Sequence, residues 1–328
     1  MLIQTESTGG IRRMRRVLGI MLVVTLISFA LAAGAVERLS LATGGTAGTY
    51  YPIGSGIASI ISKHAEGIEI TAESTGASVA NLKMLREYKI DMMMGASNTS
   101  WGGYNGHAPF DDKPVENIRG IACLYPEVFQ FITLKDSGIK TIYDLKGKKV
   151  ALGAAGSGTE RTAKMVFEAH GMSYDDFDEQ YLNFGEAVTA LKDRIIDCAV
   201  VGAGAPTSAV VDATATLDIT FVELDRGAMD PFCAERPYLA MMVLPGGTYK
   251  GQDKDVPVVA SPAILSANDR MSEDLVYRIT KALWENIDEL AAVHAQGKNV
   301  KLETALSAMS VPLHPGAEKY YKEVGLLK

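Results

Sequence analysis

The sequence contains little of what a metalloenzyme, a nucleic-acid-binding protein or a membrane-embedded protein needs. Its 328 residues include 3 cysteines and 5 histidines, and no Cys/His spacing is typical of a metal site. We therefore expect neither a metal nor another cofactor. No apolar run long enough to span a membrane follows Ala35. The formal net charge of −7 argues against nucleic acid as a partner.

The few cysteines leave their redox state open. Cys123, Cys198 and Cys233 are far apart in the sequence, so one disulfide could form in an oxidising compartment. Cys123 and Cys198 also lie in apolar, strand-like runs, where buried free thiols are common.

The first residues have the organisation of an export signal. Four arginines between positions 12 and 16 form a positive region, and an apolar run follows from Val17 to Ala32. Small residues offer cleavage sites near Ala32–Val36. A retained membrane anchor is the alternative, because the run is nearly long enough to span a bilayer. We expect residues 1–35 to be a cleaved signal peptide and the mature protein to be soluble in the periplasm.

The stretch Leu39–Tyr51 predicts a strand, a glycine-rich loop and the start of a helix. Gly44, Gly45 and Gly48 lie in the loop, and isoleucines then recur at helical spacing from Ile53. Free N–H groups at such a helix N-terminus, together with the helix dipole, favour an anion. The loop lacks the lysine of a Walker A motif and the spacing of a dinucleotide fingerprint. A tight connection without a ligand is the alternative.

The same order of predicted elements recurs about a hundred residues later. A strand at Lys149–Leu152 precedes a second glycine-rich loop, and strands at Tyr181–Phe184 and Ile196–Val201 follow with helices between them. Thr43 to Asp91 spans 48 positions, and Ala151 to Asp197 spans 46. This symmetry predicts an α/β protein of two lobes. Each lobe is an open sheet with a glycine loop at a strand's carboxyl end, and the loops face each other across a cleft.

Two crossings connect the predicted lobes. Strand-like runs on either side of Pro126-Glu127 lead out of the first lobe, and the chain returns through Val256–Ser266. We expect lobe 1 to comprise residues 36–126 and 238–328, and lobe 2 to comprise residues 127–237. A long amphipathic helix is predicted for Ser272–His294. Lobes joined in this way permit hinge closure around a ligand.

The pattern of polar residues favours binding over catalysis. Three histidines fall near predicted helix ends and His314 lies between Pro312 and Pro315, positions typical of caps or surface residues; His107, in a loop, is the least easily explained in this way. Gly153–Gly158 lacks the spacing of a nucleophile elbow. Neutral donors on loops remain, and we therefore expect no enzyme activity.

Four motifs resemble one family of transport proteins. They are Ala42–Tyr51, Gly156–Glu160, the segment from Ile196 to Pro206, and Val311–Tyr320. Together they are similar to the TAXI family, the extracytoplasmic solute receptors of one branch of tripartite ATP-independent periplasmic (TRAP) transporters. The resemblance runs from about Leu39 to the C-terminus.

The resemblance implies a periplasmic-binding-protein fold of type II, with the ligand in the interlobe cleft and the closed form docking on a membrane permease. It implies a small carboxylate as ligand, with glutamate or glutamine the reference. The family often has Gln-Ser-Asp where this chain has Ala96-Ser-Asn, and a neutral Asn98 weakens an amino-acid assignment. The implied ligand-binding residues are Gly45, Thr46, Tyr50, Tyr51, Thr75, Gly76, Ser78, Ser97, Asn98, Ser157, Gly158, Thr159 and Pro206.

A transport receptor is therefore the function that the sequence favours. We expect a monomer whose partners are a small organic anion or amino acid and the TRAP permease. A receptor that signals to a sensor protein is one alternative, and an exported enzyme on the same fold is another. We expect Thr46→Ala and Ser157→Ala to weaken ligand binding without unfolding the protein.

Overall fold

A 10-stranded mixed sheet runs through residues 36–328, which are the residues that this computed structural model describes. The predicted signal segment lies outside the described residues. The strand order is β2-β1-β3-β10-β4-β7-β5-β6, with β8 beside β4 and β9 beside β10. The strands are β1 (Glu37–Ala42), β2 (Ile68–Glu73), β3 (Met92–Ala96), β4 (Ile118–Leu134), β5 (Lys149–Ala151), β6 (Asp178–Gln180), β7 (Cys198–Ala203), β8 (Ile219–Phe221), β9 (Ala240–Leu244) and β10 (Val256–Asn268).

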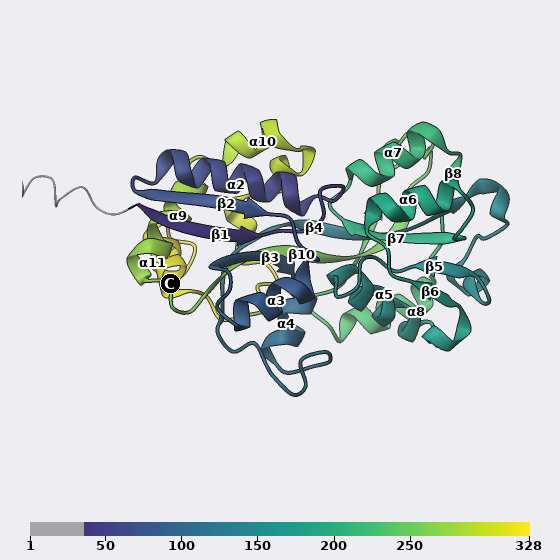
Figure 1. The fold of residues 1–328 in the computed structure, drawn as a ribbon, viewed down its shortest axis with the longest axis horizontal. Helices are drawn as coiled ribbons and strands as arrows, with labels where there is room; N and C mark the ends of the chain where they lie inside the picture. The colour runs from purple at the N-terminus through teal and green to yellow at the C-terminus, as the bar shows by residue number, and fades with distance from the viewer. Residues whose placement is uncertain (1–35) are drawn as a thin grey trace, which may run out of the picture. The chain divides into compact units, whose positions relative to one another are not determined.

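The predicted internal repeat is confirmed. The order β1-α2-β2-α3-β3 returns as β5-α5-β6-α6-β7, and the sheet orders β2-β1-β3 and β6-β5-β7 correspond. We call the part built on β1, β2 and β3 the first lobe and the part built on β5, β6 and β7 the second lobe (Figure 1). The helices are α2 (Tyr50–His64), α3 (Ser78–Arg86), α4 (Ser97–Tyr104), α5 (Gly158–Ala169), α6 (Phe184–Lys192), α7 (Ser208–Thr216), α8 (Arg226–Ala234), α9 (Glu273–Glu285), α10 (Leu290–Val293) and α11 (Pro315–Glu323).

One pair of aspartates has the same role in both repeats. Asp91, just before β3, accepts a hydrogen bond at 2.8 Å from the main-chain N–H of Ser40 in β1. Asp197, just before β7, accepts one at 2.8 Å from the N–H of Lys149 in β5. Each carboxylate satisfies a main-chain donor of the neighbouring parallel strand. The repeat read from the sequence is therefore also a repeat of side-chain contacts.

Two long antiparallel strands cross from one lobe to the other (Figure 1). β4 is 17 residues long and continues through Pro126-Glu127, where the sequence predicts a junction between two runs. β10 is 13 residues long and pairs with β3 and β4, and near its start with β9. The crossings are thus part of the sheet itself.

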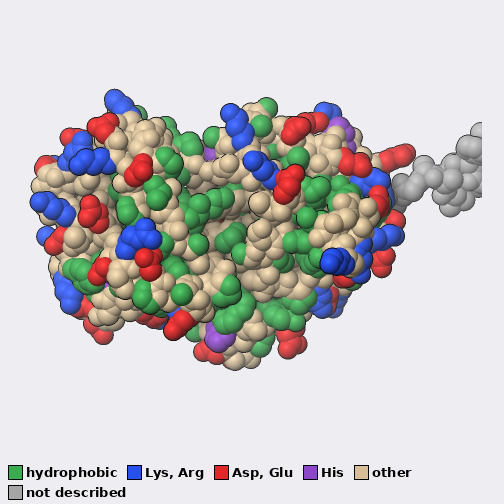
Figure 2. Space-filling view, turned by 180° about the vertical axis from the view of Figure 1, so that it is seen from behind, with side chains coloured by type: hydrophobic (Ala, Val, Ile, Leu, Met, Phe, Trp, Pro, Cys, Tyr) green, Lys and Arg blue, Asp and Glu red, His purple; other side chains and the backbone are tan. Residues whose placement is uncertain are grey.

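Apolar side chains form separate cores under the two ends of the sheet. In the first lobe, Leu41, Ile57 and Ile279 belong to one buried cluster that joins β1, α2 and α9. In the second lobe, Phe167 and Val200 belong to a cluster that joins α5 and β7. All three cysteines are free thiols; Cys198 is buried in the second of these clusters, and Cys123 is buried in a separate cluster that also contains Leu82. Figure 2 shows charged side chains mostly toward the two ends of one face, with hydrophobic and uncharged polar groups prominent between them.

Two predicted elements differ from the structure. The strand expected at Tyr181–Phe184 is β6 at Asp178–Gln180, because Asn183 caps helix α6 together with Glu186. The long helix expected at Ser272–His294 ends at Glu285. Among residues 36–328, no helix combines the length and the apolar composition needed to cross a membrane.

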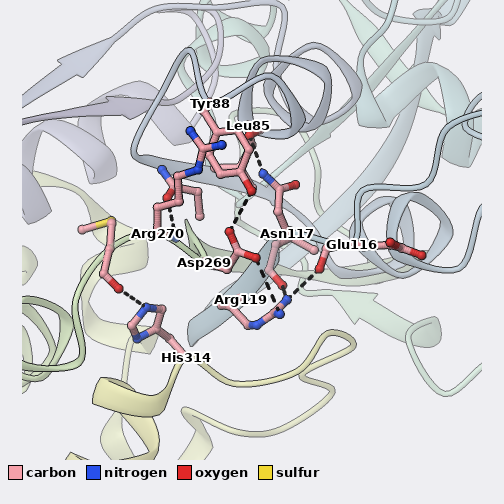
Figure 3. A network of polar contacts seen from close by, with 11 residues as sticks. Leu85, Tyr88, Glu116, Asn117, Arg119, Asp269, Arg270 and His314 are labelled. Atoms are coloured by element: carbon pink, nitrogen blue, oxygen red, sulfur yellow. Dashed lines mark hydrogen bonds and ion pairs between the residues drawn. The ribbon is translucent and has the colours of Figure 1, made fainter.

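A polar network holds the first-lobe ends of β4 and β10 (Figure 3). Tyr88 Oη donates to Asp269 Oδ1 at 3.0 Å, and the Arg270 guanidinium stacks 3.4 Å from the centroid of the Tyr88 ring. Arg119 lies 3.9 Å from the second oxygen of Asp269. The network ties the C-terminal end of α3 to both crossing strands, and none of these residues lines the cavity described next.

Candidate ligand-binding site

Four helices begin around one cavity between the two lobes. The empty space at this position is about 630 Å³ and includes a part that is open to solvent. Its wall includes the first residues of α2 and α3 from the first lobe and of α5 and α6 from the second lobe. Each helix N-terminus carries main-chain N–H groups without helical partners and a partial positive charge. The residues at these four helix starts are Thr49, Tyr50, Ala77, Ser78, Ser157, Gly158, Asn183 and Phe184.

Two serine hydroxyls in the wall can donate to a ligand. Ser78 Oγ accepts a hydrogen bond from the N–H of Ala96 at 3.0 Å, and Ser157 Oγ accepts one from the N–H of Glu160 at 3.1 Å. These bonds use lone pairs of the hydroxyl oxygens and leave both O–H groups able to donate. Ser78 lies in the first lobe and Ser157 in the second, so the cavity has a hydroxyl donor from each side.

Thr75 has a different role, although it also lines the cavity. Its hydroxyl accepts from the N–H of Ala77 and lies within hydrogen-bonding distance of the main-chain oxygen of Thr43 and of Asn81 Oδ1. The hydroxyl thus fixes the loop before α3. Asn81 is buried and donates to the carbonyls of Thr43 and Met94. The rigid base under the first-lobe loops therefore comes from side chains that the ligand does not need to contact.

Glu127 brings a carboxylate to the same cavity. It lies in the middle of β4, is 4% exposed, and accepts a hydrogen bond at 2.7 Å from Tyr50 Oη. Burial raises the pKa of Glu127 to about 8, although the Tyr50 bond favours the charged form. Burial and the nearby Glu127 carboxylate raise the pKa of Tyr50 well above its usual value, so this hydroxyl remains a donor. No lysine or arginine is among the described residues that line the cavity.

Hydrogen bonds between the lobes surround the cavity. Thr49 Oγ1 donates to the carbonyl of Gly204 at 2.8 Å, and the N–H of Ala80 donates to the carbonyl of Gly156 at 3.2 Å. A side-chain carbon added at Gly158 would meet Ser78 Oγ at 2.6 Å. The helix starts of α3 and α5 therefore approach each other closely, and only a residue without Cβ fits there. This arrangement is a closed form of the two lobes.

The structure brings most of the predicted ligand contacts together around this cavity, and their role in binding stays a prediction. Those that line the cavity are Gly45, Tyr50, Thr75, Gly76, Ser78, Ser157, Gly158 and Thr159.

The other predicted contacts lie outside the cavity wall. Thr46 is exposed, and Tyr51 and Pro206 are half-buried. Ser97 is buried and donates to the carbonyl of Ala308. Asn98 is buried at the lobe interface, where its amide donates to Thr162 Oγ1 at 2.8 Å. Asn98 thus contacts the second lobe directly, and its neutral side chain leaves the charge of the cavity unchanged.

Sequence reasoning missed several lining residues. Glu127 and Phe129 from β4 and Phe184 from α6 belong to the wall. One signal was present for Glu127, because it is the acidic residue between the two strand-like runs Ile118–Tyr125 and Val128–Lys135. A carboxylate in such a position is buried only with a partner or at a functional site.

The histidines have structural contacts away from this wall. His294 and His314 accept main-chain hydrogen bonds as N-caps, and His107 stacks on Trp101 at 4.7 Å. His170 is buried and accepts from the N–H of Asp225 at 3.0 Å. His64 lies 2.7 Å from Glu289. Among the described residues that line the cavity, none is a histidine or a cysteine.

Solved structures with this fold include bacterial binding proteins. A protein from Bordetella bronchiseptica RB50 superposes with a TM-score of 0.53 and 18% identity, over 89% of this chain and 90% of that one. The alkanesulfonate-binding protein SsuA from Xanthomonas axonopodis pv. citri, bound to MOPS, superposes with a TM-score of 0.50 and 13% identity, over 90% of this chain and 93% of that one. A putative L-cystine ABC transporter from Listeria monocytogenes superposes with a TM-score of 0.50 and 14% identity, over 81% of this chain and 98% of that one.

At these identities the likeness concerns the fold. The predicted fold of type II periplasmic binding proteins is confirmed. The sequence itself matches the NMT1-like family over residues 41–325, which is most of its length. The chain belongs to the NMT1-like family.

Proposed function

We propose that this chain is an extracytoplasmic solute receptor that binds a small carboxylate in the cavity between its lobes. One observation carries the proposal, namely that four helix N-termini and the hydroxyls of Ser78 and Ser157 surround a single space. Main-chain N–H groups and hydroxyls bind a carboxylate through charge-assisted hydrogen bonds. Closure of the lobes excludes water and strengthens such bonds.

A receptor fits the cavity wall better than an enzyme does. Acid–base catalysis needs a positioned proton donor or acceptor with a partner, and nucleophilic catalysis needs an activated side chain. The described wall holds one acidic side chain, Glu127, whose hydrogen-bond partner is Tyr50. We therefore propose binding without chemical conversion of the ligand.

We further propose that the receptor belongs to the TAXI branch of TRAP transporters and delivers its ligand to a membrane permease in the periplasm. Two motifs of the resemblance support this assignment by their place in the fold. Ala42–Tyr51 leads from β1 into α2 at the cavity, and Val311–Tyr320 contains the N-cap and most of α11. The export signal of residues 1–35 and a monomeric state complete the proposal.

The lobe boundaries are part of the same proposal. The first predicted crossing, at 126/127, lies in the middle of β4. The sequence places the second lobe boundary at 237/238 and the return of the chain to the first lobe through Val256–Ser266. Tyr238 and Tyr249 pack with clusters of the second lobe, as does Val258. This packing favours a return crossing further along the chain, near Pro262 in β10.

A ligand screen tests the carboxylate assignment. The chain from Val36 is mixed with amino acids, dicarboxylates and 2-oxo acids, each beside the corresponding carboxamide, and the unfolding temperature is recorded. A ligand that binds only the folded state at a hundredfold excess over its Kd stabilises the protein by about 2.7 kcal/mol. We expect stabilisation by a carboxylate and loss of the effect in its carboxamide. The proposal would be contradicted if an acid and its carboxamide raised the unfolding temperature equally, or if no acid raised it.

Three serine and threonine variants locate the site. Each hydroxyl that donates to a carboxylate contributes about 1.5–3 kcal/mol, so Ser78→Ala and Ser157→Ala should each raise Kd roughly tenfold or more. For Thr46→Ala we replace the expectation from the sequence, because Thr46 is exposed and lies outside the wall; this variant is the matched control with unchanged Kd. Calorimetric Kd is the appropriate measure, because Ser157 also caps α5 and its loss lowers stability by about 1 kcal/mol.

A further inference from the structure

Glu127 is the acidic group that the cavity wall contains, and nothing in the described wall neutralises it. Two factors set the pKa of the Glu127 carboxyl, namely its burial and the hydrogen bond from the Tyr50 hydroxyl. Tyr125, on the same strand, is buried and its hydroxyl has no hydrogen-bond partner within the described residues. Across the sheet, the register partner of Glu127 on β10 is Ser261. The groups around Glu127 are therefore neutral hydroxyls from α2, β4 and β10.

A carboxylate in such surroundings needs a counter-charge. Burying an ionised carboxyl group with one hydrogen bond is costly, and the group either takes up a proton or gains a cation. The protein supplies no cation here, because the described wall has no lysine, arginine or histidine. The cation can then come from the ligand.

The cavity thus has two chemically opposite parts. The helix N-termini and the hydroxyls of Ser78 and Ser157 suit a ligand carboxylate. Glu127 suits a group that donates hydrogen bonds and carries positive charge. An α-amino acid carries both groups on one carbon atom, whereas the corresponding 2-oxo acid has a carbonyl acceptor where the ammonium would be.

We propose that Glu127 binds the ammonium group of the ligand and makes this receptor selective for α-amino acids over the corresponding 2-oxo acids. The inference rests on the proposed function and identifies the ligand class for the same cavity. It also reverses the expectation drawn from Asn98. The residue that decides amino-acid binding lies on β4, while Asn98 bonds to Thr162 at the lobe interface.

Proton balance distinguishes the two ligand classes. When the lobes close on a 2-oxo acid, Glu127 is buried without a cation and must hold a proton at any pH below about 8. When they close on an amino acid, the ammonium pairs with the ionised carboxylate and no proton is needed. The two closed complexes therefore differ by one proton. Neither the α-ammonium nor the carboxylate groups of the ligands titrate appreciably between pH 6 and about 8.

The test compares each amino acid with its own 2-oxo acid. Alanine and pyruvate, glutamate and 2-oxoglutarate, leucine and 4-methyl-2-oxopentanoate, and phenylalanine and phenylpyruvate are titrated into the chain from Val36 at several pH values between 6 and 8. For the pairs that bind, we expect the ratio of the two association constants to rise about tenfold per pH unit in favour of the amino acid. This measurement uses the wild-type protein and does not depend on any variant.

A charge-removing variant assigns the effect to Glu127. Glu127→Gln keeps the shape and the hydrogen bond with Tyr50, and it should weaken amino-acid binding at least tenfold without weakening 2-oxo-acid binding, because the neutral amide needs no proton when the lobes close. Its affinity ratio should not depend on pH. Glu235→Gln is the control, because it removes the same charge from an exposed residue that pairs with Arg236.

The outcomes separate the two proposals. A pH-independent ratio in the wild-type protein, or tighter binding of the 2-oxo acids at pH 8, overturns the role of Glu127 and leaves the carboxylate receptor standing. Equal losses of both ligands in Glu127→Gln also overturn it. If no member of any pair binds, both this inference and the carboxylate assignment are overturned.

Discussion

Pro126 of β4 and Pro262 of β10 are register partners in the two strands that join the lobes. Neither residue can donate a main-chain hydrogen bond, and the register shifts between Pro262 and Ile264. The sheet is therefore held less firmly at the position where it passes from one lobe to the other. A local weakness in both crossing strands is what a hinge needs, since closure then leaves the sheets of the lobes intact.

Hydrogen exchange should locate this hinge. In the ligand-free protein, we expect the amides of Glu127 and Ala263 to exchange faster than those at 129–133 of β4, because fewer ladder bonds protect them. Adding a carboxylate that binds should slow exchange at the two hinge positions more than elsewhere in the strands. Uniform protection along β4 before and after ligand addition would contradict a hinge at the proline pair.

Arg161 of α5 contacts the first lobe in this closed form. Its guanidinium donates to the carbonyl of Asn98 at 3.1 Å and to that of Ala108 at 3.2 Å, both on the first lobe. Arg161 does not line the cavity. Replacing it should therefore act on the closing equilibrium and not on the ligand contacts.

We expect Arg161→Ala to raise the apparent Kd roughly tenfold, because two hydrogen bonds from a charged but partly solvated group are lost from the closed form. The dissociation rate should account for the change, with little effect on association. Stopped-flow measurement of both rates is the check. Arg194→Ala is the matched control, since Arg194 pairs with Asp136 inside the second lobe. An equal effect of both variants would argue against a role in closure.

Ala77, which precedes α3 at the cavity, has a backbone conformation that is nearly restricted to glycine. Its φ is 67° and its ψ is −150°. Such a conformation costs a residue with a side chain about 1–3 kcal/mol. Ala77→Gly should therefore raise the unfolding free energy by about 1 kcal/mol, after the larger entropy of the unfolded chain is subtracted. Urea denaturation measures this change.

Ala80→Gly provides the comparison for that variant. Ala80 lies inside α3, where glycine costs about 1 kcal/mol relative to alanine. The two substitutions should thus change stability in opposite directions. A loss of stability in both would show that the conformation of Ala77 is not strained.

The repeat was predictable because short local sequence patterns indicate each of its elements. Glycine-rich loops follow apolar strands twice, and Asp91 and Asp197 precede the last strand of each repeat. The helix starts that surround the cavity follow from the same loops, which is why residues such as Ser78 and Ser157 could be placed near a ligand. Parallel strands connected through helices leave few alternatives for where those loops meet.

Other parts depend on contacts that no local pattern records. Glu127 becomes part of the site through Tyr50, which lies 77 positions earlier in the chain. The segment Tyr181–Phe184 alternates like a strand. In the structure Asn183 and Glu186 form a capping box, so helix α6 begins there. Helix α4 begins with Ser97 and Asn98, whose polar side chains are buried against other segments, so its sequence shows no amphipathic period.

His314 should make the fold sensitive to acid. It is 2% exposed and caps α11, where its Nδ1 accepts from the N–H of Gly316 at 3.1 Å and its Nε2 lies 3.0 Å from the carbonyl of Met271 (Figure 3). Burial lowers the pKa of His314. A ring that accepts at Nδ1 must be neutral there, so protonation would break the cap.

The direction of the pH effect follows from this lowered pKa. Below the ordinary histidine pKa near 6.5 the unfolded chain binds a proton that the folded chain does not, so stability falls as pH decreases, by at most about 1.4 kcal/mol per pH unit. His314→Asn keeps a capping acceptor without titrating. When the pH is lowered from 7.5 to 5.5, urea denaturation should therefore show a smaller loss of unfolding free energy in the variant than in the wild type. Parallel curves would mean that His314 remains able to take up a proton in the folded state, which its contacts with Gly316 and Met271 oppose.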